Sequence, residues 1–430
     1  MIDLRKIVVC VAMLAFHAVC MAQVKVYNDN PDSTAVSLSD SIVALPDSTV
    51  AAEDTLLPWA ERVRTRLDRL VAAPMFETSQ VGMCVYDITA DSLVYAKNMR
   101  QTMRPASTEK VLTAVTALLQ LGGSYRFETS LYADGTVTDS VLEGNIYIRG
   151  GMDPMFGHDD MRAFALAVKG LGIDSIAGEI CVDISIKDTL KWGNGWCWDD
   201  DMPPLRALLY NGKDCFMQEF FSALDEQGIT VNVSSRRFTT TKINDATDIQ
   251  SIVTRYHTID QILIPMLKDS ENTYAEALFY QLGAQDKRNY AEAKFSASKV
   301  KAMISRVGLD PSRYVVADGS GVSLYNYASP ELLMKVLVYA RSRSNIYDHL
   351  YPSLPVAGSD GTLERRMRGT AAQYNVHAKT GTLEGVITLA GYAMSPEEHE
   401  LAFAIFNQGV MHARNARNFQ DKVCRAITEK

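Results

Sequence analysis

A serine and a lysine stand three residues apart at Ser107 and Lys110, within the stretch PASTEK. A serine hydroxyl becomes a nucleophile when a base within hydrogen-bond reach removes its proton, and a lysine of lowered pKa is such a base. Residues three apart share one face of a helix, so the two side chains meet if a helix begins at or just before Ser107. Pro105 is suited to a first helical turn, and the apolar run VLTAVTALLQL that follows predicts a buried helix that would desolvate the lysine.

The same pattern also has a purely structural interpretation. Ser107 could only cap a helix, with Lys110 solvated, because serine is a preferred N-cap residue. Two further Ser-x-x-Lys matches, Ser296–Lys299 and Ser298–Lys301, lie inside a polar helical stretch without a helix start or an apolar continuation. The pattern alone therefore does not identify a nucleophile, and other parts of the chain have to select among the matches.

Two other motifs make that selection. The triplet from Ser270 through Glu271 to Asn272 lies between two predicted helices, where it could also be an ordinary N-cap. Residues 379–382, Lys-Thr-Gly-Thr, lie in a predicted strand, and its glycine would let a ligand approach the backbone closely. Ser-x-x-Lys, Ser-x-Asn and Lys-Thr-Gly occur in this order at a helix start, in an inter-helix loop and in a strand. Together they predict acyl transfer through Ser107 and Lys110.

The elements around the motifs indicate an α/β (α+β) fold. A helix is expected from about residue 59 to 71, followed by two strands joined by a turn near Ala90. From residue 123 to about 250 short strands dominate, with a helix near residues 159–172. Long helices return from about Thr258, and strands and a terminal helix close the chain. This pattern predicts a main domain formed by residues 58–122 and 251–430, interrupted by a mostly β inserted domain at 123–250.

The N-terminus predicts export from the cytoplasm. Arg5 and Lys6 precede a short apolar run that ends in small residues, which is typical of a signal peptide spanning residues 1–22 and cleaved after Ala22. The run is too short for a stable membrane span, and the residues before Cys20 fit a lipoprotein signal poorly. Residues 23–57 are rich in Asp, Ser, Thr and Pro, which predicts a flexible linker. We therefore expect a periplasmic protein.

The composition narrows the possible functions. The chain has 430 residues, 47% of them hydrophobic, and a formal net charge of −8, so it can bury a large core and carries no basic signature of nucleic-acid binding. Five cysteines follow the predicted signal peptide, without C-x-x-C spacing. One disulfide is possible, and most of the five are expected to be small buried residues. No zinc-peptidase motif occurs, so neither a metal nor another cofactor is expected.

With these motifs in place, the chain resembles the D-alanyl-D-alanine carboxypeptidase/endopeptidases of the penicillin-binding protein 4 type, the class C low-molecular-mass penicillin-binding proteins. The resemblance runs from about Pro58 to the C-terminus and includes RGGMDP, GNGWCWDDD, SENTYAEAL, DGSGVSLYNYASP and KTGTLEGVITLAGY. It implies a transpeptidase-like domain of the penicillin-binding and serine β-lactamase type, an antiparallel sheet flanked by helices. Ser270 follows Lys110 by 160 positions, which implies one substantial insertion, with a second one reduced or absent.

The resemblance also implies roles for the motif residues. Ser107 would attack the carbonyl between the last two D-alanines of a peptidoglycan stem peptide, and Lys110 would accept its proton. Ser270 would relay a proton to the leaving D-alanine, with Lys379 keeping the local field positive. Asn272 would orient Lys110 and bind the substrate amide. β-Lactam antibiotics would acylate the same serine.

The strand motif would bind the substrate's end. By the resemblance, Thr380 and Thr382 bind the terminal carboxylate beside Gly381, and the backbone N–H groups of Ser107 and Thr382 form the oxyanion hole. A free carboxylate calls for cations and hydroxyls nearby, and a tetrahedral oxyanion calls for fixed N–H donors.

The chain departs from the family pattern in a pocket associated with the substrate's branching side chain. Leu324 stands where an arginine is common, and Glu384 where a glutamine is common, while Asp199 and Asp200 resemble acidic residues that meet the side chain's amino group. The pocket is thereby more anionic, which predicts a preference for a cationic side chain, such as lysine or diaminopimelate with its carboxylate masked. The alternative is that the acidic residues only form a solvated loop.

Two other functions compete with a carboxypeptidase. A serine β-lactamase needs a deacylating carboxylate, and no E-x-x-L-N stretch stands between the second and third motifs. A catalytically weak scaffold or sensor that binds peptidoglycan would not need the lysine base. The sequence does not separate carboxypeptidase from endopeptidase activity, because both use one acylation site.

Overall fold

The computed structural model describes residues 57–200, 202–231, 238–240, 243, 249–286 and 290–430. The predicted signal peptide and nearly all of the predicted linker lie outside these ranges. Within them, none of the helices combines the length and the apolar character that crossing a bilayer requires.

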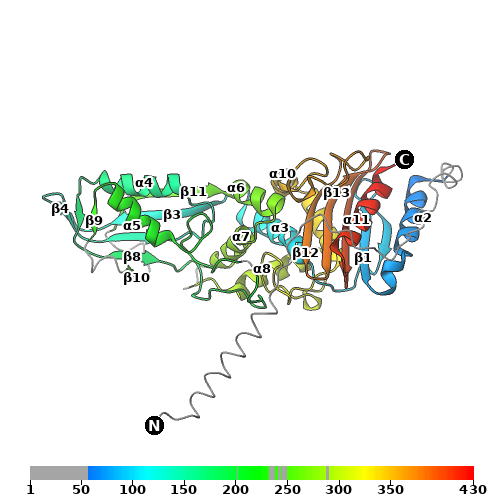
Figure 1. Ribbon diagram of the computed structural model, residues 1–430, viewed down its shortest axis with the longest axis horizontal. Helices are drawn as coiled ribbons and strands as arrows, with labels where there is room; N and C mark the ends of the chain where they lie inside the picture. The colour runs from blue at the N-terminus through cyan, green and yellow to red at the C-terminus, as the bar shows by residue number, and fades with distance from the viewer. Residues whose placement is uncertain (1–56, 201, 232–237, 241–242, 244–248, 287–289) are drawn as a thin grey trace, which may run out of the picture. The chain divides into compact units, whose positions relative to one another are not determined.

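Five antiparallel strands form the central sheet, in the order β12, β13, β14, β1, β2 (Figure 1). Their bounds are β1 Gln80–Asp87, β2 Ser92–Lys97, β12 His377–Leu383, β13 Val386–Met394 and β14 Glu400–Gln408. The sheet thus joins an early segment of the chain to its end, and the predicted strand pair around Ala90 and the predicted Lys-Thr-Gly strand are confirmed.

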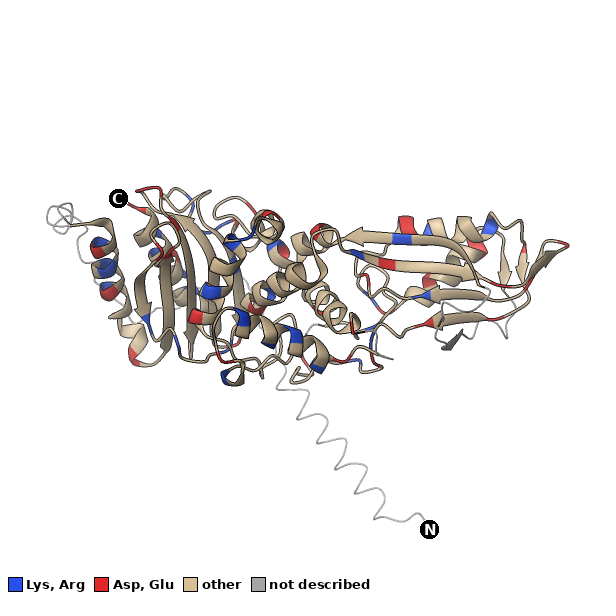
Figure 2. Ribbon diagram, turned by 180° about the vertical axis from the view of Figure 1, so that it is seen from behind, with Lys and Arg blue, Asp and Glu red and all other residues tan. Residues whose placement is uncertain are grey.

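Helices cover both faces of this sheet (Figure 1 and Figure 2). Side chains alternate along each strand, so each face has its own core. In β14, Ala402, Ala404 and Phe406 pack with α3, α7 and α9, whereas Phe403 and Ile405 pack with α2 and α11. The helices of this part are α2 Trp59–Val71, α3 Glu109–Leu121, α6 Ile259–Ile264, α7 Asn272–Ala284, α8 Ala293–Arg306, α9 Pro330–Arg341, α10 Ser344–Ser353 and α11 Ala413–Thr428. The result is the predicted antiparallel sheet flanked by helices.

Residues 126–258 form two further sheets, ordered β10-β8-β6-β3-β11 and β4-β5-β7-β9. The strands are β3 Arg126–Ala133, β4 Thr136–Thr138, β5 Val141–Glu143, β6 Ile146–Arg149, β7 Ser175–Ile176, β8 Ile180–Asp183, β9 Thr230–Val231, β10 Phe238–Thr240 and β11 Gln250–Thr258. Two helices, α4 His158–Lys169 and α5 Phe216–Glu226, share their core. The division into domains at residues 123 and 250 stays a prediction.

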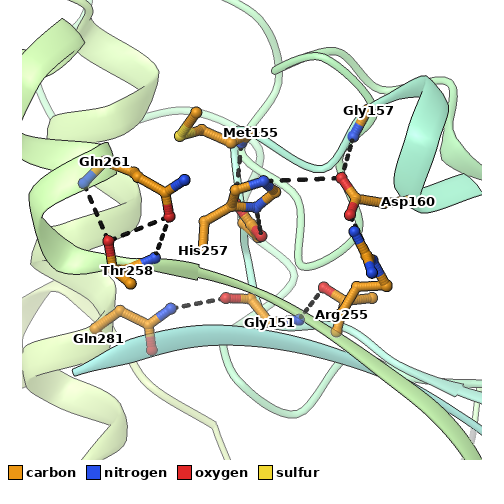
Figure 3. Close-up of polar contacts among 11 residues, drawn as sticks. Gly151, Met155, Gly157, Asp160, Arg255, His257, Thr258, Gln261 and Gln281 are labelled. Atoms are coloured by element: carbon orange, nitrogen blue, oxygen red, sulfur yellow. Dashed lines mark hydrogen bonds and ion pairs between the residues drawn. The ribbon is translucent and has the colours of Figure 1, made fainter. Parts of the chain in front are cut away.

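A set of paired charges lies where β11 meets α6, and we call Asp153, Asp160, Arg255 and His257 the junction cluster (Figure 3). His257 Nδ1 lies 2.7 Å from Asp153 Oδ2, and Arg255 Nε donates to Asp160 Oδ1 at 2.7 Å. Each carboxylate also accepts a backbone N–H. The hydrogen bond with Asp153 raises the pKa of His257 against the effect of burial. Every member of the cluster therefore has a partner of opposite charge.

Gln281 of helix α7 also contacts the residues beside the junction cluster. Gln281 Nε2 donates to the Gly151 carbonyl at 2.7 Å (Figure 3), and Tyr125 Oη donates to Gln281 Oε1 at 2.8 Å. The RGGMDP stretch thus follows β6 directly and is anchored to α7, the helix that begins with the second motif.

Three elements have weak signals in the sequence and were not predicted. Strand β11 is exposed or half-buried along most of its length, so it lacks the alternation of a core strand. Helix α10 carries Pro352 near its end, where proline normally interrupts a helix. Helix α5 buries Phe216, Phe220 and Leu224 at helical spacing, a signal that could have been used.

Candidate active site

Ser107 lies in a short 3-10 turn, Ala106–Thr108, that leads directly into α3. Ala106 has a φ of 48°, in the left-handed region that residues other than glycine seldom adopt. Two hydroxyls fix the turn, because Thr108 Oγ1 and Thr388 Oγ1 of β13 donate to the Pro105 carbonyl at 2.6 and 2.7 Å. A strained turn held by its surroundings is typical of functional sites.

Lys110 connects the first two motifs. Its side chain is fully buried, and Nζ donates to Ser107 Oγ at 3.0 Å, to Asn272 Oδ1 at 2.7 Å and to the Ser320 carbonyl at 2.8 Å. An ammonium group has three donors, so this geometry uses all of them. The predicted contact between Ser107 and Lys110 is therefore present. The two other Ser-x-x-Lys matches, Ser296–Lys299 and Ser298–Lys301, lie within α8.

The surroundings of Lys110 suit a base. Burial lowers the pKa of Lys110 to about 8, against the opposing effect of the Asp318, Glu276 and Glu271 carboxylates. With such a pKa about a tenth of the lysines are unprotonated at pH 7 and about half at pH 8, and the neutral amine has a lone pair for the Ser107 hydroxyl proton. The neutral amine keeps two N–H donors for Asn272 and the Ser320 carbonyl.

Buried acids surround this lysine, and the sequence reasoning missed them. Glu276 Oε1 accepts the backbone N–H groups of Gly319 and Ser320 at 3.0 and 2.8 Å, which fixes the carbonyl that Lys110 contacts. Burial and the nearby Asp318 raise the pKa of Glu276 to about 8. Burial, followed by Asp318 and Glu276, raises the pKa of Glu109 well above its usual range, and Glu109 Oε1 has no hydrogen-bond partner. A carboxyl inside an otherwise apolar helix face would have been a usable signal.

The second motif forms one wall of a cleft. A π-helical turn, Pro265–Asp269, ends at Ser270, whose φ of 68° reverses the chain before α7 begins at Asn272. Ser270 and Asn272 line a cleft of about 820 Å³ together with Met202 and Lys213 from the region between β8 and α5. The predicted position of the motif, where one helix ends and another begins, is confirmed.

The third motif brings a second buried lysine to the same region. Lys379 of β12 is fully buried, and its Nζ donates to the neighbouring Thr380 carbonyl at 3.0 Å. Burial and the nearby Lys110 lower the pKa of Lys379 well below its usual range, against a smaller effect of Asp269. Thr380 Oγ1 donates to Thr362 Oγ1 at 2.7 Å, while Thr382 is exposed. Two desolvated lysines thus favour a bound anion.

Gly381 explains how β12 approaches the nucleophile. A Cβ at this position would lie 2.9 Å from the Ser107 nitrogen and 2.1 Å from Thr388 Oγ1. Any side chain here would therefore push the strand away from the serine turn. The close approach of the Ser107 turn requires the glycine of the third motif, while the approach of a ligand to this backbone stays a prediction.

The residues of the expected side-chain pocket lie on two separate segments. Asp200 Oδ2 accepts the Cys197 N–H at 2.6 Å within the loop that follows β8. Trp196 Nε1 of this loop donates to Asp318 Oδ2 at 2.8 Å, so the loop packs against the segment that holds the Lys110 acceptor Ser320. Glu384 is exposed just after β12 ends, and no contact joins it to Asp200 among the described residues.

The arrangement has the parts of an acyl-transfer site. It has a hydroxyl beside a desolvated amine, a second buried lysine, and a strand whose backbone approaches the serine N–H closely. The described residues contain no group of three or more His, Cys, Asp or Glu side chains that could hold a metal ion. The geometry provides proton transfer and anion stabilisation by side chains and backbone.

Comparisons with known proteins agree with this chemistry. The model of the D-Ala-D-Ala carboxypeptidase 3 (S13) family matches residues 63–212 and 203–430. The D-alanyl-D-alanine carboxypeptidase DacB of Haemophilus influenzae is 24% identical over 414 residues, covering 77% of this chain and 86% of that protein. The D-alanyl-D-alanine carboxypeptidase of Actinomadura sp. is 26% identical over 439 residues, covering 81% of each.

The fold is also that of a solved relative. The crystal structure of penicillin-binding protein 4 (dacB) from Haemophilus influenzae superposes with a TM-score of 0.74 and 22% identity, covering 83% of this chain and 97% of that one. The same relative has a crystal structure in complex with a β-lactam, with a TM-score of 0.69, 22% identity, and coverage of 83% and 98%. Because the family model spans nearly the whole described chain, this protein belongs to the D-Ala-D-Ala carboxypeptidase 3 (S13) family.

Proposed function

We propose that this protein is a serine D-Ala-D-Ala carboxypeptidase that shortens peptidoglycan stem peptides through an acyl-enzyme on Ser107. Family membership supports the reaction class. The observation that carries the proposal is the convergence of the three motifs, since Lys110 Nζ contacts Ser107 and Asn272 while Gly381 lies against the Ser107 nitrogen.

Acylation begins with proton transfer. Neutral Lys110 takes the hydroxyl proton of Ser107 as Oγ attacks the carbonyl carbon of the penultimate D-alanine. The C–O bond forms, and the carbonyl oxygen becomes an oxyanion between the backbone N–H groups of Ser107 and Thr382. A fixed donor of this kind is worth about 2.7–4 kcal/mol of barrier.

Collapse of the oxyanion breaks the peptide bond. Ser270 passes its hydroxyl proton to the leaving nitrogen and takes the proton that Lys110 received from Ser107, so Lys110 returns to the neutral amine. Lys379 lies beside this transfer as a second buried lysine. Asn272 keeps Lys110 in position and binds the substrate amide. Water then attacks the ester and releases the shortened peptide, which regenerates the Ser107 hydroxyl.

The substrate's end is bound by the β12 strand. Thr380 and Thr382 contact the terminal carboxylate beside Gly381, where no side chain obstructs the backbone. In the side-chain pocket, Asp200 and Glu384 favour a cationic branch over an anionic one. Comparing turnover of peptides with amidated and free diaminopimelate tests this preference, and faster turnover of the free acid would contradict it.

β-Lactams are expected to acylate Ser107, because they present a strained amide and a carboxylate to the same groups. The relative from Haemophilus influenzae has been crystallised in complex with a β-lactam, which supports this expectation. The N-terminal signal predicted from the sequence would bring the enzyme to the periplasm, where its substrate is located.

Muropeptide analysis tests the proposed reaction. We expect the purified protein to remove one D-alanine from stem pentapeptides, and the Ser107→Ala variant to remove none. The Ser298→Ala variant removes the serine of another Ser-x-x-Lys match, which lies in α8, and should keep full activity.

The same assay distinguishes the alternative functions. Loss of cross-linked dimers would show endopeptidase activity in addition. Rapid turnover of a chromogenic cephalosporin without D-alanine release would indicate a β-lactamase instead. Penicillin binding without any hydrolysis would indicate a scaffold or sensor.

A further inference from the structure

An arginine of the C-terminal helix reaches the third motif. Arg417 lies in the second turn of α11, and its Nη2 is 3.5 Å from Thr382 Oγ1 on β12. Both side chains are exposed at the edge of the sheet. None of the three motifs includes this residue, since it lies 35 positions beyond Thr382 in the sequence.

Packing between α11 and the sheet fixes this proximity. Gln420 lies three positions after Arg417, hence on the same side of the helix, and its Nε2 donates to the Ile387 carbonyl at 3.2 Å. Ile387 is the register partner of Thr382 in the β12–β13 pair. Ala416 is fully buried and packs with Ile387. Arg417 is therefore positioned beside Thr382 by the backbone register.

The guanidinium of Arg417 is available to an anion. Among the residues that the structure describes, no carboxylate lies within ion-pair distance of it. The nearby Arg366 instead forms an ion pair with Asp421, with its Nη2 at 2.6 Å from Asp421 Oδ1. Arg366 also donates from Nη2 to the Arg417 carbonyl at 3.3 Å, which helps to hold this turn of the helix. An unpaired arginine beside a hydroxyl matches the two-oxygen geometry of a carboxylate.

We propose that Arg417 binds the carboxylate of the substrate's C-terminal residue together with Thr382, and so makes the enzyme select peptides that end in a free acid. This inference rests on the proposed function, because it places the substrate's end along β12. The buried Lys379 supplies positive charge but donates to a backbone carbonyl, whereas Arg417 offers exposed paired N–H donors. Arg417 is thus a specificity-determining residue, and the proton transfers remain with Lys110 and Ser270.

The test compares two peptides that differ only at the C-terminus, one ending in D-Ala-D-Ala with a free carboxylate and the other in D-Ala-D-alaninamide. Steady-state kcat/KM is measured for both with wild type, Arg417→Ala and Arg417→Lys. We expect Arg417→Ala to lower the acid-to-amide ratio of kcat/KM about 10- to 100-fold, as loss of a hydrogen bond between charged groups implies. Arg417→Lys keeps the charge and should retain an intermediate ratio.

Controls separate this proposal from the proposed function. Lys422→Ala removes another exposed cation of α11 and should leave the ratio at the wild-type value. Thermal unfolding of each variant establishes that it is folded. An unchanged ratio in Arg417→Ala, or an equal fall for both peptides, overturns the role of Arg417 while D-alanine release by wild type still supports the enzyme. If wild type hydrolyses neither peptide, the proposed function fails and the carboxylate site fails with it.

Discussion

The junction cluster and the candidate active site both bury charged side chains, and they differ in how those charges are paired. At the junction, Asp153 and Asp160 each face a basic side chain and a backbone N–H. In the active site, two fully buried lysines lie near one another, and Glu109 has an oxygen without a partner. Burial without pairing shifts pKa values toward the neutral forms, and such shifts are concentrated at functional sites.

The difference teaches which buried charges serve stability and which serve chemistry. A satisfied ion pair holds two segments together, and removing one partner leaves an uncompensated charge. A buried lysine without an ion-paired carboxylate costs stability but supplies a base near neutral pH. We therefore expect changes in the active site to abolish activity with little loss of stability, and changes at the junction to do the reverse.

The largest expected effect comes from Lys110→Arg. Arginine keeps the positive charge but cannot lose its proton, so it cannot act as a base. We expect the rate of acylation by a fluorescent penicillin to fall at least about 10³-fold, within the range for loss of a general base. Near-normal acylation by this variant would show that Lys110 contributes only charge.

The converse change is Asp153→Ala in the junction cluster. It leaves His257 without its carboxylate, and we expect the free energy of unfolding in urea to fall by about 3 kcal/mol. Asp159→Ala, a change at an exposed neighbour in the first turn of α4, should alter it by no more than about 0.5 kcal/mol. The folded Asp153→Ala protein should be acylated by penicillin at the wild-type rate. A large fall in this rate would show that the junction cluster also contributes to activity, which contradicts the comparison.

The pH profile of acylation should reflect the shifted lysine. Because neutral Lys110 is the base and its pKa is lowered to about 8, the acylation rate should rise as the pH increases through about 8. Glu276→Gln removes a carboxylate that raises the pKa of Lys110, so the rise of the acylation rate should occur at lower pH. Glu109→Gln should leave the pH of this rise unchanged, since the carboxylates that raise the pKa of Lys110 are Asp318, Glu276 and Glu271. A profile that is flat from pH 6 to 10 would exclude Lys110 as the titrating base.

The smallest expected effect is the pH dependence of the junction. The pKa of His257 is raised in the folded protein, so its pairing stabilises fully below the unfolded value of 6.5 and is lost as the pH rises through the higher folded value. Relative to His257→Gln, wild type should therefore lose about 1 kcal/mol of unfolding free energy between pH 6 and 9. An identical pH dependence in both proteins would mean that folding does not shift the pKa of His257.

The sequence predicted the parts of the site that depend on short, local patterns. Ser107 and Lys110 share one helical turn, and the second and third motifs lie at the predicted inter-helix loop and strand. The contact between Lys110 and Asn272 followed from the family resemblance. For Gly381 the strand position predicted a close approach by a ligand, and the structure shows that the Ser107 turn also lies against this glycine.

Other parts depend on tertiary contacts that no local pattern encodes. Arg417 meets Thr382 because α11 packs on β13 in one register. Strand β11 has no core-facing alternation, since it lies at the edge of its sheet. In each case a residue distant in the sequence determines the environment, which periodicity alone does not reveal.

The most direct test of the central claim is to locate the acyl group. The protein is incubated with benzylpenicillin, its intact mass is measured, and a proteolytic digest is mapped by mass spectrometry. The account predicts a single penicilloyl adduct on the peptide containing Ser107 and no adduct in Ser107→Ala. An adduct on another residue, or an adduct that persists in Ser107→Ala, would contradict it.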